Sequence, residues 1–362
     1  MAINKILATI CPKRIIAVKL ENRLFKNINP RDYLTKLCGF NILSSMSLSD
    51  IAASNHNQLA ALNNMGPERA SKAIAASRLF LEGVDIEETA FDAITSKMSV
   101  LMLHSHDGAL YKDLCAVADL AGDIATKLGL SLERINDLVI AGLYHDLGKA
   151  AGKDADRHVE IASTKIHDEY KRMTIEEATT RLFAKRDRLT HKNETVGDFV
   201  NRTFKDKAER EAIFDALLHG IRVTKEDEMR TFFNLHTYFG ADFLEGTASY
   251  TVLRLVALHH ILELVNALDH KMMWATYAID GYHDYDKRAS VRLAIESAKD
   301  MGFWEDLVIL IVADKLDAYK RRTDMSLAQA SENLRAYVRK DDNKVLTEEE
   351  KKDFYRVLDK IV

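Results

Sequence analysis

The strongest chemical signal in the sequence is the pair His145-Asp146, which opens the run His145-Asp146-Leu147-Gly148-Lys149. An apolar stretch with helical spacing leads up to this pair, through Ile135, Leu138, Val139 and Leu143. A carboxylate in such a setting is costly unless it is paired or bound to a metal ion. Neighbouring imidazole and carboxylate groups at one helix end can serve adjacent cations, so the run predicts a metal site.

Three further His/Asp sets accompany this pair. Gly240 comes one helical turn after His236 and leaves room for a neighbouring helix or a metal ion. The adjacent pair His259-His260 ends an apolar run, and buried imidazoles need partners. Asp314 follows another apolar run and shares a helix face with Asp317, which is either a further ligand or only a supporting carboxylate. Nitrogen and carboxylate ligands without thiolate are compatible with iron, manganese, zinc or nickel.

These sets resemble the motifs of the HD superfamily, and of its HD-GYP branch in particular, from about Asp113 to Leu334. The resemblance implies a bundle of helices that holds two divalent transition-metal ions, with iron or manganese expected. It assigns Lys149 to a substrate phosphate and makes Asp146 and Lys149 the catalytic residues. The metal ligands that it implies are Asp113, His145, Asp146, His236, His259, His260 and Asp314.

The first of these ligands departs from the family pattern. Asp113 stands where the family has a histidine, with His104 and His106 nearby but out of register. Where some members carry an additional Glu, this chain has Ala109, so a third metal ion is not expected. Asp113 can still ligate through oxygen, but its negative charge should disfavour a doubly anionic substrate.

The GYP part of the pattern is absent. His260 is followed by Ile261 instead of Glu, and no proline follows Pro67 anywhere in the chain. Residues 280–283 are interpreted as a displaced remnant of that motif. Because these positions line the substrate, we do not expect efficient, selective hydrolysis of cyclic di-GMP.

Paired cations can activate water and stabilise charge on phosphoryl oxygens. The leading hypothesis is therefore a metal-dependent phosphodiesterase or phosphohydrolase, with a cyclic dinucleotide as the substrate class that the resemblance implies. One alternative is an HD-type nuclease or nucleotide phosphohydrolase directed to DNA by the N-terminal part. Another is a catalytically silent HD fold that binds a nucleotide or an interaction partner.

The N-terminal part contains a second motif. A turn at Asn64-Met65-Gly66-Pro67 lies between two predicted helices, the second covering residues 68–81. Gly66 can take positive φ and Pro67 suits a first helical turn. The segment from about Asp32 to Gly83 resembles the helix-hairpin-helix of RadC-like proteins, which implies weak, sequence-independent DNA contact. A plain helical docking module is an equal alternative.

Composition and the placement of the prolines predict an all-α protein. All prolines lie within the first 67 residues, so the rest of the chain can be helical throughout. The net charge of −4 excludes a global basic field for nucleic acid. Cys11, Cys38 and Cys115 are dispersed and form no Cys-x-x-Cys pair, which favours a reducing compartment. With no apolar run long enough for a bilayer and no leader pattern, we expect a cytoplasmic location.

The expected organisation has five parts. Residues 1–29 are ambiguous, residues 30–83 form the helix-hairpin-helix-like module, and an acidic linker covers residues 84–95. The phosphohydrolase domain spans residues 96–340, with a highly charged insertion at about 150–230 interpreted as a solvated helical surface. Residues 341–362 form a C-terminal helical tail. The oligomeric state is not predicted.

Overall fold

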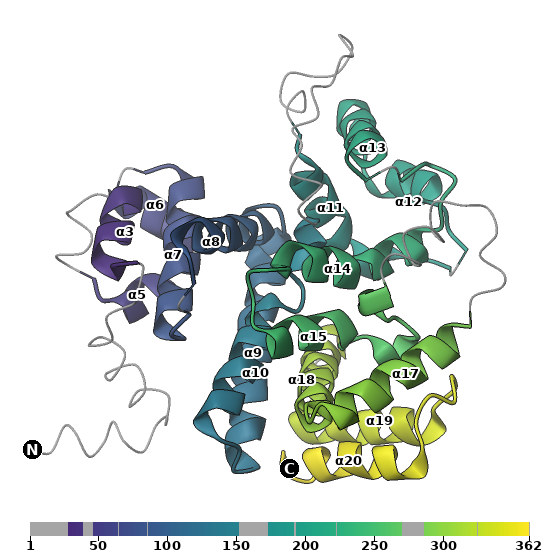
Figure 1. Ribbon diagram of the computed structural model, residues 1–362. Helices are drawn as coiled ribbons and strands as arrows, with labels where there is room; N and C mark the ends of the chain where they lie inside the picture. The colour runs from purple at the N-terminus through teal and green to yellow at the C-terminus, as the bar shows by residue number, and fades with distance from the viewer. Residues whose placement is uncertain are drawn as a thin grey trace, which may run out of the picture. The chain divides into compact units, whose positions relative to one another are not determined.

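The computed structural model describes residues 28–38, 46–63, 65–84, 86–151, 173–191, 193–221, 223–269, 286–323 and 325–361. In these ranges the chain forms α-helices and short 3-10 helices, and the sole β-type pairing is one isolated bridge between Thr195 and Glu228. The all-α prediction is therefore confirmed (Figure 1). The chain divides into two compact units, Met1–Leu103 and His104–Val362.

The first unit is organised around one long helix. Its helices are α3 (Pro30–Cys38), α5 (Leu48–Ala52), α6 (His56–Asn63), α7 (Pro67–Leu81) and α8 (Glu88–Leu103). Each of the other helices packs on α7. Tyr33, Phe80 and Phe91 form an aromatic core among α3, α7 and α8, with ring centroids 4.6–5.9 Å apart. Burial of such large rings stabilises a small helical unit.

The turn that resembles a helix-hairpin-helix differs in detail from its prediction. Pro67 does occupy the first turn of α7, as expected. Gly66, however, is the N-cap of α7 with φ −68° and ψ 153°, an extended conformation that other residues also adopt. The positive φ that glycine permits is therefore not used at this turn. Asn64 lies outside the described residues.

The predicted acidic linker is largely helical instead. Helix α8 begins at Glu88, and Phe91 and Ile94 are fully buried against the rest of the first unit. The Tyr33 hydroxyl donates to Asp92 Oδ1 at 2.9 Å, which fastens α8 to α3. The acidic side chains cover the exposed face of an amphipathic helix, which composition alone does not distinguish from a linker.

The second unit contains the predicted metal motifs. Its helices are α9 (Ala109–Lys127), α10 (Leu132–Tyr144), α11 (Ile175–Phe183), α12 (Val196–Thr203), α13 (Lys207–Ile221), α14 (Met229–Leu244), α15 (Tyr250–Leu258), α17 (Lys287–Asp300), α18 (Trp304–Thr323), α19 (Leu327–Lys340) and α20 (Glu348–Leu358). Short 3-10 helices connect them, at His106–Gly108 (η1), Leu147–Ala150 (η2), Arg186–Arg188 (η4), Ile261–Glu263 (η5) and Ala267–Asp269 (η6). Helices α9, α10, α14, α15 and α18 pack together as the core.

Close backbone approach brings the first pair of core helices together. A Cβ at Gly142 of α10 would lie 2.5 Å from Ala118 Cα of α9. Only glycine fits at that distance, so Gly142 sets the spacing of α9 and α10. This contact fixes the end of α10 that leads to His145.

The charged insertion is a packed part of the second unit. Ile175, Phe183, Phe199 and Ile213 are buried, and α11 packs on both α13 and η2. The interpretation as a merely solvated surface is wrong, because each amphipathic helix there turns an apolar face inward. Residues 152–172 of this insertion lie outside the described residues.

The predicted C-terminal tail also belongs to the packed unit. Helix α20 packs on α18 and α19 and buries Phe354, Val357 and Leu358. Its Glu350 carboxylate is buried, and Arg292 Nη1 and Lys299 Nζ contact it at 2.6 and 2.5 Å. Because of these hydrogen bonds, which outweigh the opposing effect of burial, the pKa of Glu350 is lowered to about 2.

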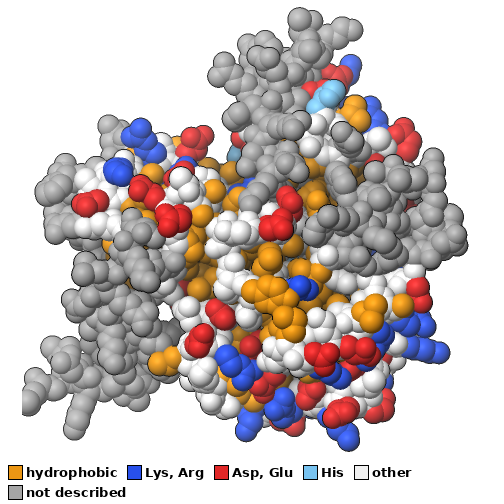
Figure 2. All heavy atoms as spheres, viewed as in Figure 1, with side chains coloured by type: hydrophobic (Ala, Val, Ile, Leu, Met, Phe, Trp, Pro, Cys, Tyr) orange, Lys and Arg blue, Asp and Glu red, His pale blue; other side chains and the backbone are white. Residues whose placement is uncertain are grey.

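Charge on the visible surface is mixed. Figure 2 shows acidic and basic side chains interspersed over α17, α19 and α20, without a large patch of one sign. This agrees with the small net charge. Among the described helices, none combines the length and the apolar character that crossing a bilayer requires. The predictions for residues 1–27 and 280–283 fall outside the described residues.

Candidate metal centre

Two helix ends place the predicted ligands of the centre. His145 caps the C-terminus of α10, and Asp146 begins the 3-10 turn η2. His259 caps the C-terminus of α15 in the same way, and His260 begins η5. We call these segments the first turn (residues 145–151) and the second turn (residues 259–264). Both lie where an apolar helix stops, so their polar side chains are held by buried backbone.

The centre draws on two further helices. His236 lies within α14 and is fully buried, and Asp314 lies within α18 at 9% exposure. The His145 and His259 ring centroids are 5.2 Å apart, and those of His236 and His259 are 5.5 Å apart. Four segments that are distant in sequence thus meet at one place.

The histidines His145, His236 and His259 share one hydrogen-bond arrangement. Each Nδ1 donates to the carbonyl oxygen three residues earlier, at 2.7, 2.7 and 2.6 Å respectively. A carbonyl only accepts, so the proton of each neutral ring lies on Nδ1 and the lone pair lies on Nε2. The three Nε2 atoms are buried and have no hydrogen-bond partner among the described residues.

These Nε2 atoms surround the carboxylate of Asp146. Its oxygens lie 3.1 Å from His145 Nε2, 3.1 Å from His236 Nε2 and 4.0 Å from His259 Nε2. Asp314 Oδ1 lies 3.8 Å from His145 Nε2 on the other side. Imidazole lone pairs that face carboxylate oxygens repel one another, and a shared cation relieves that repulsion.

Burial and charge displace the pKa values of these groups. Burial lowers the pKa of His236 and, more strongly, that of His259, where the neighbouring imidazoles add to the effect. Burial would lower the pKa of His145 too, but the Asp146 carboxylate outweighs it and raises that pKa. The pKa of Asp146 is held well below its usual range because His145 and Lys149 outweigh burial. The lowered pKa values keep His236 and His259 neutral beside an ionised carboxylate, as metal coordination requires, whereas His145 must lose its proton when a metal ion binds.

His260 differs from the other three histidines. Its Nδ1 lies 3.4 Å from Glu263 Oε2, whose carboxylate is in turn paired with Lys315 of α18. His260 still lies beside the others, because ligand atoms of His236, His259 and His260 fall within 4.8 Å of one another. Sequence reasoning missed Glu263, although its spacing of three residues from His260 is a usable signal.

Lys149 lies next to Asp146 and forms a buried ion pair with its Oδ2. The turn that carries Lys149 is pressed against α14. A Cβ at Gly148 would lie 1.9 Å from the His236 carbonyl oxygen and 2.4 Å from Gly240 N. Gly148 therefore permits the first turn to touch the backbone of the helix that supplies His236. At Gly240 an added Cβ would meet its nearest neighbour at 3.4 Å, so this second glycine is less constrained.

Asp113 has a partner that sequence reasoning missed. Its Oδ2 lies 2.7 Å from Arg321 Nη1, and Arg321 Nε donates to Asp317 Oδ2 at 2.6 Å. Burial raises the pKa of Asp113 to about 6, although Arg321 and Lys149 oppose the rise. The spacing of Arg321 four residues after Asp317 on one face of α18 indicates that pair, but not the pairing with Asp113.

The insertion supplies part of the wall beside His236. The Phe183 ring lies 5.6 Å from the His236 ring at an edge-to-face angle of 73°. Phe232 and Phe233 are buried as predicted core residues. The Arg186 guanidinium lies 5.7 Å above the Phe233 ring, and its charge contributes to lowering the pKa values of His236 and His260.

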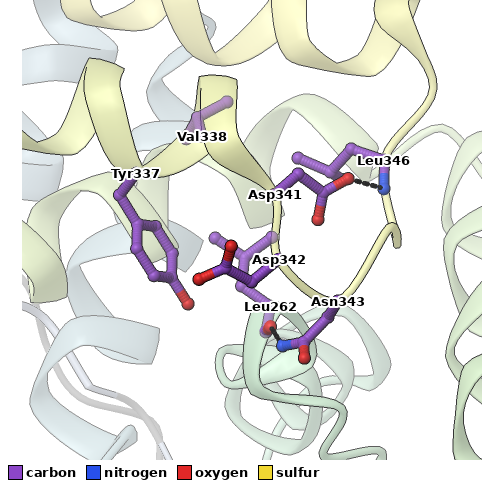
Figure 3. A pocket seen from close by; sticks show the side chains of 7 residues that line it. All are labelled: Leu262, Tyr337, Val338, Asp341, Asp342, Asn343 and Leu346. Atoms are coloured by element: carbon purple, nitrogen blue, oxygen red, sulfur yellow. Dashed lines mark hydrogen bonds between the residues drawn. The ribbon is translucent and has the colours of Figure 1, made fainter.

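A separate pocket lies against the second turn. Figure 3 shows its lining residues, which come from η5, from the end of α19 and from the loop that follows. The Asn343 side chain donates to the Leu262 carbonyl at 2.7 Å, which ties that loop to η5. None of the predicted metal ligands lines this pocket.

The residues present fit a metal centre. The unpartnered Nε2 atoms, Asp146 Oδ1 and the Asp314 carboxylate are nitrogen and oxygen donors held by rigid helices, and each Nδ1–H is fixed by a carbonyl. Metal-binding histidines typically donate their other ring N–H in this way. No thiolate takes part, which suits a hard or borderline divalent ion.

Comparison with protein families agrees with this geometry. The family model described as HD domain matches residues 110–213, which is less than a third of the chain. The matched part includes Asp113, His145, Asp146 and Lys149 but ends before His236. Searches of curated proteins and of solved structures gave no match. This match supports the HD superfamily for residues 110–213, a superfamily whose domains are generally metal-dependent hydrolases.

Proposed function

We propose that the protein is a metal-dependent phosphohydrolase that cleaves a phosphodiester at the centre around Asp146. The single observation that carries the proposal is the shared orientation of His145, His236 and His259, whose unpartnered Nε2 atoms face one carboxylate. A set of neutral imidazoles without hydrogen-bond partners is costly in a protein core. Its retention therefore favours a ligand-binding role over a structural one.

The residues around the centre have separate tasks in this proposal. His145, Asp146, His236, His259 and Asp314 would hold the divalent ions, with His260 beside them. Such ions, when bound, activate water and polarise a phosphoryl oxygen. Lys149 pairs with Asp146 and would contact a phosphate oxygen of the substrate. Phe183 and Phe233 exclude water from the side of His236.

The substrate class is the finer part of the proposal. The resemblance to the HD-GYP branch favours a cyclic dinucleotide, whereas Ile261 and the missing proline argue against selective cleavage of cyclic di-GMP. The charge argument from Asp113 loses weight, because Arg321 pairs with that carboxylate. The missing GYP motif therefore remains the stronger reason to expect another substrate.

Two alternatives keep the fold and change the activity. A nuclease or nucleotide phosphohydrolase would use the same donors on a different substrate. A catalytically silent HD fold would bind a nucleotide or partner without turnover. DNA contact by the N-terminal unit would favour the nuclease alternative. A mobility-shift series with the full chain tests this contact, which should weaken steeply with added salt.

The test is a turnover screen of the full chain with Mn²⁺ and with Fe²⁺. It covers cyclic dinucleotides, nucleotides, and single- and double-stranded DNA, with Asp146→Asn as the matched inactive control. Hydrolysis of any phosphoester that Asp146→Asn abolishes supports the proposal. Stoichiometric metal binding without turnover on any substrate favours the silent alternative. A clear preference for cyclic di-GMP would show that the missing GYP motif does not decide the choice of substrate.

A further inference from the structure

The carboxylates around the centre pair with different cations. Asp146 pairs with Lys149 of its own turn, and Glu263 pairs with Lys315 of α18. Asp113 and Asp317 share one guanidinium, that of Arg321. The chain therefore supplies its own positive charge at the Asp113 side, whereas the imidazole Nε2 atoms around Asp146 have no protein partner in the described part of the chain.

The geometry at Arg321 is that of a fixed cation. Its Nε and Nη1 contact carboxylates on two different helices at 2.6 and 2.7 Å, so α9 and α18 are bridged by the guanidinium. The side chains of Asp113 and Asp317 are 3% and 10% exposed, which makes both carboxylates dependent on this partner. Buried carboxylates need a positive partner, and a guanidinium supplies it in a planar, directional form.

What is left at Asp113 is too little for a metal ion. Its Oδ2 is taken by Arg321, and its Oδ1 is the remaining buried oxygen without a hydrogen-bond partner among the described residues. A divalent ion requires several donor atoms, of which Asp113 could supply Oδ1 alone, and the positive guanidinium on the same carboxylate repels a second cation. The Asp146 charge also contributes to raising the pKa of Arg321, which places this cation within electrostatic range of the centre.

We propose that the Arg321 guanidinium takes the place of a bound cation at Asp113, and that Asp113 holds Arg321 instead of a metal ion. This inference rests on the metal centre proposed above and assigns its ions to the residues around Asp146 alone. A guanidinium stays charged across the whole accessible pH range and is not removed by a chelator. The positive charge on this side of the centre is therefore independent of metal supply.

The decisive experiment counts metal ions in the full chain. Wild type, Asp113→Asn, Arg321→Gln and Arg321→Lys are each loaded with Mn²⁺, desalted and analysed by mass spectrometry. Asp113→Asn should retain the wild-type metal content, because Asp113 is not a ligand. Arg321→Gln should gain about one Mn²⁺ per chain, since it leaves the carboxylates of Asp113 and Asp317 unpaired within electrostatic range of Asp146 and the donors around it. Arg321→Lys should gain none, because the charge is kept.

Arg134 provides a matched control. It has a similar side-chain exposure of 35% against 38% for Arg321, and it also contacts two carboxylates, those of Glu305 and Asp306. It lies eleven residues before His145 on α10, which is about 16 Å along the helix axis. Arg134→Gln should not gain an ion, whereas an equal gain there would show a general property of stripped carboxylates and overturn the inference.

The remaining outcomes are also decisive. Loss of an ion in Asp113→Asn would make Asp113 a ligand and overturn the inference, as would an unchanged metal content in Arg321→Gln. Melting curves with and without Mn²⁺ give a second readout, in which the stabilisation by Mn²⁺ should be larger for Arg321→Gln than for wild type. A wild type that binds no metal would refute the proposed function, while the difference between Arg321→Gln and wild type would still decide this inference.

Discussion

The first and second turns share one backbone arrangement but present different side chains to the centre. In both, an apolar helix ends on a histidine whose Nδ1 donates to the carbonyl three residues earlier, and a 3-10 turn follows. In both, the residue after that histidine lies next to a polar side chain three residues on, Asp146 next to Lys149 and His260 next to Glu263. The groups differ: the first turn presents a carboxylate to the centre, and the second presents an imidazole whose pKa is lowered by burial.

The turns also differ in how they are held. The first is pressed against the α14 backbone at Gly148, so its position is set by contact. The second has no glycine in η5 and is tied by Glu263 to Lys315 of α18, and by Leu262 to Asn343. Packing against backbone tolerates little adjustment, whereas an ion pair between partly exposed side chains can shift. We therefore infer that the first turn is the rigid side of the centre and the second the adjustable one.

The largest expected effect comes from substituting Asp146, and His260, its equivalent in the second turn, gives the comparison. Asp146→Asn should weaken Mn²⁺ binding by more than the roughly 100-fold that loss of an outer-shell group costs, because this carboxylate faces three imidazoles. His260→Gln should weaken it roughly tenfold, since one ring nitrogen already faces Glu263. Competition with a chelator of known affinity measures both. The opposite order would place the principal ligand in the second turn.

The glycines of the first turn and of α14 give the next effect. Gly148→Ala should lower the free energy of unfolding by about 3 kcal/mol, because its Cβ would overlap backbone atoms that cannot move aside. Gly240→Ala should change it by less than about 1 kcal/mol, since the added methyl meets ordinary contacts and alanine favours a helix. Urea unfolding of both variants provides the measurement. Equal losses would mean that the first turn is free to move away from α14.

The sequence predicted the centre better than its surroundings. The resemblance to the HD motifs placed His145, His236, His259 and Asp314 in one site, and the sequence supported it because each lies in or at the end of a strongly apolar helix. Residue roles that depend on partners from distant helices were not visible. The pairing of Asp113 with Arg321 joins residues 208 positions apart, and neither helix alone indicates it.

Element boundaries failed where composition was ambiguous. The acidic stretch before Phe91 has the composition of a linker, yet its apolar residues are spaced to bury one helix face. Gly66 can adopt a left-handed conformation, but its role as the N-cap of α7 requires only an extended one. Permission to adopt a backbone conformation does not predict its use.

The smallest expected effect tests whether the second turn is adjustable. Lys315 is deeply set, with 17% of its side chain exposed, and Glu263 is 24% exposed. Glu263→Gln leaves the ammonium group without its charged partner and should lower the free energy of unfolding by about 1–2 kcal/mol, less than for a fully buried pair because water screens part of the loss. The double variant Glu263→Gln/Lys315→Met removes the unpaired charge as well and should recover part of that loss, as measured by urea unfolding.

Mn²⁺ affinity should fall only severalfold in Glu263→Gln, because His259 keeps its hydrogen bond to Val256 and the first turn keeps its contact with α14. A drop as large as that of Asp146→Asn would show instead that the ion pair with α18 is what holds the second turn in place, and that both sides of the centre are equally rigid.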